Sequence, residues 1–262
     1  MSGAYAAESN PDIPRVRRIG FSDLRIALDG GLEDFRAFPS HAVFLCLIYP
    51  IVGIFLGGLL LSYYVVPLFF PLVAGFALIG PFAAVGLYEL SRRRELGLDS
   101  SWQHAFDVLR SPAKWSVFGL GVLLMAIFIA WLLTARWLYH VTMAPLAPQD
   151  AGAFLRDLFT TGAGWRMIVW GNLIGFVFSV IALCLSVVSF PLLLDRDVSA
   201  AVAILTSVRA VLENPVVMAG WGIIVAAALV AGSVPFLLGL AVVMPVLGHA
   251  TWHLYRRVVV AN

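Results

Sequence analysis

Six long apolar stretches dominate this chain, and each is about as long as a bilayer is thick. A helix of about 20 apolar residues crosses the hydrocarbon core of a membrane. Hydrophobic residues make up 61% of the chain, well above the share in a soluble domain. The sequence therefore predicts an all-α, polytopic membrane bundle with transmembrane helices at 42–63, 66–90, 115–138, 167–193, 216–234 and 237–256.

Short amphipathic segments divide these stretches into three similar units. Each segment ends in a proline that opens the next apolar run, at FRAFP, LRSP and LENP, where the prolines are Pro39, Pro112 and Pro215. Proline fits the first turn of a helix because its missing N–H has no partner to lose there. In 101–111 and 198–213 apolar residues recur at helical spacing. We expect interfacial helices here, each followed by a membrane hairpin.

The proposed repeat units are 21–91, 100–194 and 199–258, within one membrane domain at 21–262. Residues 1–20 form a cytoplasmic, flexible tail in this interpretation. In the first unit, Gly30-Gly31 is expected to break the amphipathic helix. Pro81, Pro191 and Pro245 are expected to kink the second helix of each hairpin, because proline removes a backbone hydrogen bond.

The basic residues predict the orientation. Cytoplasmic loops retain Lys and Arg, and with the N-terminus inside, fourteen of them fall inside and three outside. Both termini are then cytoplasmic, and the outer loop 139–166 carries a small helix around Phe154. We expect the arginines at the ends of spans to contact lipid headgroups; these are Arg92, Arg93, Arg94, Arg256 and Arg257.

Two histidines lie four residues apart in the last span. His249 and His253 share one helix face, and imidazole pairs at this spacing can bind a transition metal or haem iron. His41 is the histidine at similar depth that could join them. No Glu follows His249, as a zinc hydrolase motif would need. The structural alternative is an interfacial belt in which His249 hydrogen-bonds across helices. We expect no cofactor and no metal.

Small residues mark two packing motifs. Gly53 and Gly57 lie in the first span, and Gly171 and Gly175 lie in the fourth, each pair four residues apart. Such spacing lets helix backbones approach closely. Asn172 is the amide placed deep in a span, and we expect it to hydrogen-bond a neighbouring helix.

The C-terminal LGHATWHLYRR, with Gly248–Tyr255 as its most specific part, and the LRSP-W segment resemble an uncharacterised bacterial six-helix inner-membrane family. That family is a domain of unknown function, and its members are sometimes labelled cytochrome c oxidase subunit I-like. The resemblance is expected to cover most of the chain after residue 40. It implies a multi-pass protein of the bacterial inner membrane. The five histidines of this chain are too few for an oxidase core, so the label leaves only the role of an accessory or assembly partner of a respiratory complex.

Three functions remain open on the sequence. The first is a non-catalytic membrane protein, an accessory subunit, scaffold or assembly partner of a membrane complex. The second is a transporter or channel for a small solute, although the spans lack the carboxylates of ion-coupled transport. The third is a haem or metal protein that uses His249 and His253. Nothing in the sequence resembles a nucleic-acid surface.

Overall fold

The computed structural model describes residues 13–37, 66–146, 148, 150–234 and 239–260. These residues are helical apart from turns, connections and one isolated antiparallel bridge between Val16 and Val259. Among these described residues, four helical segments are long and apolar enough to cross a membrane. Their bounds are Phe70–Glu95, Lys114–Thr142, Gly162–Asp195 and Pro215–Ser233.

The structure therefore shows part of the predicted arrangement of six transmembrane helices. The segment 42–63 lies outside the described residues. The last predicted span forms helix α11 (Leu240–Val258), but α11 is not among the four apolar segments. It carries two histidines and two arginines and packs in the interior of the protein.

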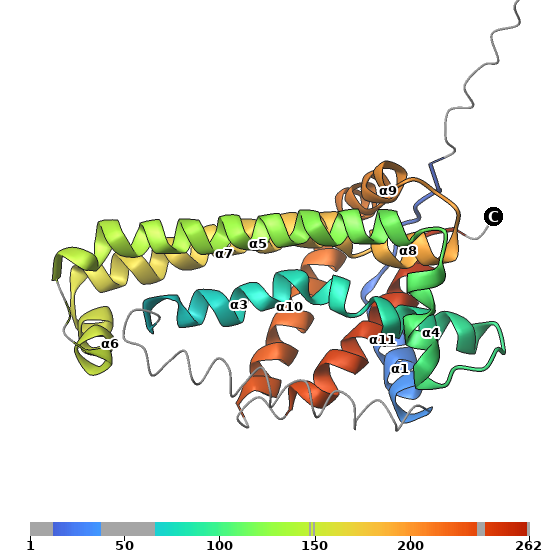
Figure 1. Cartoon of the computed structure of the whole chain (residues 1–262), viewed down its shortest axis with the longest axis horizontal. Coiled ribbons are helices and arrows are strands. Elements are labelled where there is room, and N and C mark those ends of the chain that lie inside the picture. Colours follow the sequence, from blue (N-terminus) through green and yellow to red (C-terminus); the bar gives the residue numbers. More distant parts are fainter. Residues whose placement is uncertain (1–12, 38–65, 147, 149, 235–238, 261–262) are drawn as a thin grey trace, which may run out of the picture.

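Two long helices, α5 (Lys114–Thr142) and α7 (Gly162–Ser186), lie side by side along the long axis of the molecule (Figure 1). The expected small helix of the outer loop is present as α6 (Ala151–Thr160), which follows a short turn, η3 (Ala144–Leu146). Helix α3 (Val66–Ala83) runs beneath the pair. Trp131 of α5 fixes it there, since its indole Nε1 donates to the carbonyl of Pro71 at 2.8 Å.

The first two helices that were expected to kink are interrupted near their prolines. Helix α4 (Val85–Glu95) follows α3 after a break at Ala84, three residues beyond Pro81. Helix α8 (Ser189–Asp195), which contains Pro191, follows α7 after a break at Val187 and Val188. Pro245 lies inside the continuous helix α11.

Helix α9 (Ala200–Glu213) packs into the break between α7 and α8. The hydroxyl of Ser207 accepts a hydrogen bond from the backbone N–H of Val188 at 3.2 Å. The hydroxyl of Ser189 lies 2.6 Å from the carbonyl oxygen of Leu185 and 3.1 Å from that of Ala203. Side chains from both sides thus satisfy backbone groups that the interrupted helix leaves unpaired.

The segment 101–111 forms a short 3₁₀ helix, η2 (Trp102–Arg110), instead of an α-helix. Ala105 lies against α4, where a Cβ added to Gly86 would be 3.0 Å from the Ala105 side chain. Trp102, Phe106 and Leu109, from the predicted apolar face, are exposed.

Helix α1 (Phe21–Ala37) is continuous through Gly30 and Gly31, which corrects the expected break. Both glycines face α11 at very short range, so they serve close packing rather than helix termination. The chain before α1 is also held in place: Arg17 N donates to Val258 O at 2.9 Å, and Val260 N donates to Arg15 O at 3.0 Å. The end of the predicted flexible tail is therefore bound to the C-terminal segment.

The buried core includes side chains from most of the helices, α4, α8, α10 and α11 among them. The large side chains that are almost fully buried there are Tyr88, Phe190, Trp221, Trp252 and Tyr255. Helix α10 (Pro215–Ser233) and α11 lie obliquely to the α5–α7 pair in Figure 1. They approach each other closely at the far end, because a Cβ on Gly239 would lie 2.8 Å from Gly232 Cα.

Candidate functional site: a polar cluster between α1, α4 and α11

Five polar residues from three helices meet in the interior beside α11. Asp34 comes from α1, Ser91 and Arg94 come from α4, and His249 and His253 come from α11. Asp34, Ser91 and His249 are each 2% exposed or less. Polar groups at such burial are costly unless hydrogen bonds satisfy them, so their partners decide what the cluster can do.

Asp34 is the centre of this cluster. Its Oδ2 accepts a hydrogen bond from Ser91 Oγ at 2.5 Å and lies 2.9 Å from His253 Nε2. Its Oδ1 accepts from the Arg94 guanidinium. Ser91 Oγ also lies 2.7 Å from His249 Nδ1. With the hydroxyl proton donated to Asp34, His249 Nδ1 carries the proton that it donates to Ser91.

The surroundings of Asp34 keep its carboxylate ionised. Burial raises the pKa of Asp34, but hydrogen bonds from His253, Ser91 and Arg94 outweigh burial and lower the pKa to about 2. The cluster is therefore an anion held by donors from two other helices.

Three glycines let the helices come close enough for these bonds. A Cβ on Gly30 would lie 2.9 Å from the ring of His253, and one on Gly31 would lie 2.6 Å from Ala250 Cβ and from the Val246 carbonyl. A Cβ on Gly248 would lie 2.6 Å from Leu87 of α4. Real Cβ atoms do not approach this closely. At Gly31 the neighbours include backbone atoms of α11, so glycine is required there, whereas at Gly30 and Gly248 the neighbouring side chains would have to move.

A second set of ion pairs surrounds the C-terminal end of α11. Glu95 accepts from Trp252 Nε1 and from Arg256 Nε, each at 3.0 Å. Asp195 accepts from the Tyr255 hydroxyl at 2.5 Å and from Arg256 Nη1 at 3.2 Å. These bonds join α4 and α8 to α11, so the ends of three helices are held together by one group of charges.

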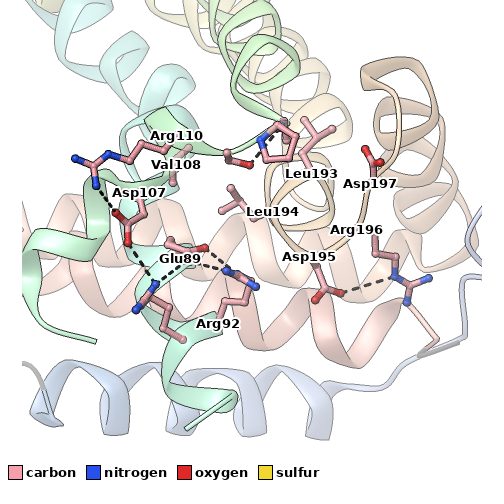
Figure 2. Close-up of a pocket in the computed structure, with 14 residues that line it drawn as sticks. Glu89, Arg92, Asp107, Val108, Arg110, Leu193, Leu194, Asp195, Arg196 and Asp197 are labelled. Atoms are coloured by element: carbon pink, nitrogen blue, oxygen red, sulfur yellow. Dashed lines mark hydrogen bonds and ion pairs between the residues drawn. The ribbon is translucent and has the colours of Figure 1, made fainter. Parts of the chain in front are cut away.

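Next to this end, a cleft of about 360 Å³ opens between α4, η2, the start of α5 and the end of α8 (Figure 2). Its walls contain four arginines and four carboxylates. The charged residues are Glu89, Arg92, Arg93, Asp107, Arg110, Asp195, Arg196 and Asp197.

The structure brings together two of the three candidate histidines through a residue that the sequence analysis did not single out. His249 and His253 both reach Asp34, His249 by way of Ser91. His41, Gly53 and Gly57 lie outside the described residues. Among the described residues, no group of three or more His, Cys, Asp or Glu side chains is placed to hold a metal ion.

The fourth-span motif faces α5. A Cβ on Gly175 would lie 3.1 Å from Trp131, and one on Gly171 would lie 3.6 Å from Leu138. Within the described part of the chain, the Nδ2 of Asn172 donates to the Ile168 carbonyl of α7 itself at 2.8 Å. Asn172 is exposed, because the α7 face that packs on α5 is the one that carries the two glycines.

The arginines expected at lipid headgroups are each paired with a carboxylate of this chain. Arg92 donates to Glu89 through two nitrogens at 2.8 Å, and Arg93 reaches Asp107 at 3.3 Å. The remaining partners are Asp34 for Arg94, Glu95 and Asp195 for Arg256, and Asp23 for Arg257. These carboxylates come from α1, α4, η2 and α8, so the first contacts of the five arginines are within the protein.

Asp34 could have been found from its spacing. Leu24, Ala27, Gly31 and Asp34 lie on one face of a helix at steps of three and four residues, and all four are buried. Treating Gly30-Gly31 as a break hid this continuity. A charged residue on the buried face of a glycine-containing helix is the signal that points to a polar partner.

The arrangement does not resemble a hydrolase triad. A serine nucleophile must reach a substrate, but Ser91 is 1% exposed and its hydroxyl lies between a histidine and a carboxylate. The cluster can link three helices, or it can pass protons along the chain of hydrogen bonds from His253 to His249.

Residues 69–195 match the model of a family described as "Predicted integral membrane protein (DUF2189)". The matched segment is just under half of the chain. It begins within α3, ends with Asp195 of α8 and includes three of the four apolar segments completely. The match confirms the expected likeness to an integral membrane family of unknown function. It does not include Gly248–Tyr255, on which that likeness was expected to be strongest. Searches of curated proteins and of solved structures found no match.

Proposed function

We propose that this protein is a non-catalytic subunit of the bacterial inner membrane that binds another membrane protein through the outer face of α7. It serves as an accessory, scaffold or assembly partner, with both termini in the cytoplasm and with η2 and α9 near the membrane surface. The observation that carries the proposal is the exposure of Asn172 within an apolar helix.

Depth is the first part of the argument. Asn172 is ten residues from the start of α7, which corresponds to about 15 Å along a helix. The predicted span begins at 167, just after Arg166, so Asn172 lies about 8 Å inside the hydrocarbon core. Polar side chains at this depth usually face protein rather than lipid.

Neighbours on the same face extend the surface. Phe176 and Ser179 follow Asn172 at four and seven residues, so the three side chains lie in one exposed row. Ser179 bonds the Gly175 carbonyl of its own helix at 2.9 Å. An amide has four hydrogen-bonding positions, and Asn172 uses one of them in the described part of the chain. This row combines unused hydrogen-bonding positions of Asn172 with large apolar side chains. Such a surface packs better against another helix than against lipid.

Native electrophoresis of the solubilised membrane protein tests this proposal. Wild-type protein should migrate as a complex with a second protein, and Asn172→Leu should shift it towards the free chain. Thr134→Val is a matched control on α5, because Thr134 also bonds a carbonyl of its own helix, that of Ala130 at 2.8 Å. This control should leave the complex intact.

Two results would contradict the proposal. One is wild-type protein that migrates as a single chain in mild detergent. The other is a complex that contains only copies of this chain, which would make α7 a dimer contact instead.

A second candidate function is a transporter or channel for a small solute. The polar cluster favours it, because Asp34 supplies an interior carboxylate that the apolar spans lack. Uptake into proteoliposomes that Asp34→Asn abolishes would favour this alternative.

The haem or metal alternative depends on His249 and His253. An absorption spectrum and elemental analysis of the purified protein would test it. A stoichiometric cofactor lost in both His249→Ala and His253→Ala would replace the accessory role.

A further inference from the structure

The charged cleft of Figure 2 lies where three apolar segments end. Two of these segments, Phe70–Glu95 and Gly162–Asp195, end at the cleft. The third, Lys114–Thr142, begins directly after Ala113, which lines the cleft. Whichever way the chain is inserted, three membrane segments have their boundary here. The cleft is therefore at the depth of lipid headgroups rather than in the hydrocarbon or in bulk water.

The charges of the cleft balance. Four arginines face four carboxylates, so the net formal charge of the lining is zero. Several of these charges are satisfied within the protein. Glu89 is held by Arg92, and Asp195 is bonded by Tyr255 and Arg256. A ligand of strong net charge would disturb this balance, whereas a zwitterion would not.

Two opposite charges at the rims remain available to a ligand. Arg110 is 89% exposed in its side chain, and its nearest carboxylate oxygen, Asp107 Oδ1, is 4.0 Å away. Asp197 is exposed and forms no ion pair among the described residues. Figure 2 shows them on opposite sides of the cleft, Arg110 on η2 and Asp197 after α8. Between them, the lining includes the apolar side chains of Val108, Leu193 and Leu194.

We propose that this cleft binds the headgroup of a phospholipid of the ethanolamine class. Arg110 contacts the phosphate and Asp197 accepts a hydrogen bond from the primary ammonium. A cleft of about 360 Å³ is within the size range of small-molecule sites. The acyl chains lie along the outer side of α5, where Trp115 and Phe118 are exposed.

The proposal predicts a specific lipid preference. A choline headgroup has the same charges but no N–H, so it cannot donate to Asp197. A phosphatidylglycerol headgroup has a net negative charge and lacks the ammonium. Losing one charge-assisted hydrogen bond corresponds to about tenfold weaker binding, so both lipids should bind about tenfold more weakly than the ethanolamine lipid.

Native mass spectrometry of the full-length protein in detergent can measure this preference. Ethanolamine, choline and glycerol phospholipids with identical acyl chains are added in turn, and the fraction of protein with one bound lipid is recorded. Arg110→Ala and Asp197→Asn should each weaken binding of the ethanolamine lipid about tenfold. Asp197→Glu should restore most of it. Arg156→Ala, an exposed arginine on α6, is the control and should bind as wild type does.

Equal binding of the three lipids would overturn the proposal, as would unchanged binding in both Arg110→Ala and Asp197→Asn. Soluble glycerophosphoethanolamine provides a further arm. If it displaces the lipid at equal concentration, the site recognises a soluble phosphate ester and the assignment to a membrane lipid is wrong. Arg110 and Asp197 are exposed, so both variants should keep the wild-type melting temperature.

Discussion

Asp34 joins α1 to α4 and α11, and it is the most deeply buried acidic residue of α1. Its side chain is 3% exposed, and Arg94 and His253 pair with it. Removing one partner of a buried pair leaves the other charge unsatisfied, which is more costly than losing the pair itself.

Asp34→Asn should lower the free energy of unfolding by about 2–4 kcal/mol. The asparagine keeps the size of the side chain but removes the negative charge that Arg94 and His253 face. Asp29→Asn is the control on the same helix: Asp29 pairs with Arg25 at 3.8 Å, and both are largely exposed. That change should cost less than about 0.5 kcal/mol. Thermal unfolding of the two variants in one detergent measures the difference, and equal losses would contradict the account.

The same carboxylate should make stability depend on pH in acid. The folded pKa of Asp34, about 2, is below the ordinary value of 3.8. The contribution of Asp34 is thus complete above pH of about 4 and is lost as the pH falls through about 2. The ionised Asp34 carboxylate contributes about 2 kcal/mol to the free energy of unfolding. Wild-type protein should lose this much relative to Asp34→Asn over that range, whereas parallel curves for the two proteins would show that Asp34 is not the group concerned.

Among the helices, α1 shows how close packing can override a local rule. Gly30 and Gly31 are poor helix formers by propensity, yet α1 passes through both. The contact with α11 outweighs the propensity, because only a residue without a Cβ fits against Ala250 and Val246.

Gly31→Ala should therefore separate α1 from α11. The added Cβ would lie 2.6 Å from backbone atoms of α11, and strain of this kind costs about 1–3 kcal/mol. Gly119→Ala on α5 is the control, since nothing lies within 4 Å of its new Cβ; it should be neutral or stabilise the helix by up to about 1 kcal/mol. Limited proteolysis of the chain around α1 should accelerate in the first variant alone. Equal protection in both would mean that α1 tolerates the added methyl group.

The sequence predicts the apolar helices well and the polar contacts between them poorly. Spans 115–138 and 216–234 correspond closely to α5 and α10, because length and hydropathy alone define such helices. The interruption at Val187 and Val188 lies one turn before Pro191, where proline removes a backbone hydrogen bond. The interruption at Ala84 follows Pro81 and is not explained by that bond. The span 237–256 is helical, but α11 has a polar, buried surface that hydropathy does not reveal.

The candidate site depends on contacts that are distant in sequence. Asp34 and His253 are 219 residues apart, and no local pattern pairs them. The helical spacing of His249 and His253 identifies one side of the cluster correctly. The arginine triplet at 92–94 identifies another side. Arg92 pairs with Glu89 of the same helix, whereas Asp34, the partner of Arg94, comes from α1.

At the scale of the whole molecule, two groups of helices share one polar end. In Figure 1, α6 lies at one end of the α5–α7 pair, α10 and α11 run below the pair, and α1 and α4 lie towards the end opposite α6. Ion pairs and the cleft concentrate where α4, α8 and α11 end. This distribution indicates a protein whose apolar helices lie in the bilayer, with a charged end at one surface.

We infer that α6 and the charged cleft lie on opposite sides of the membrane, joined by α5 and α7. Reporter fusions after Leu146 and after Asp197 test it most directly, using one reporter active outside the membrane and one active inside. The account predicts an outside signal after Leu146 and an inside signal after Asp197, because the segment Gly162–Asp195 crosses once between them. Signals from the same side at both positions would contradict the membrane arrangement on which the α7 surface and the lipid cleft depend.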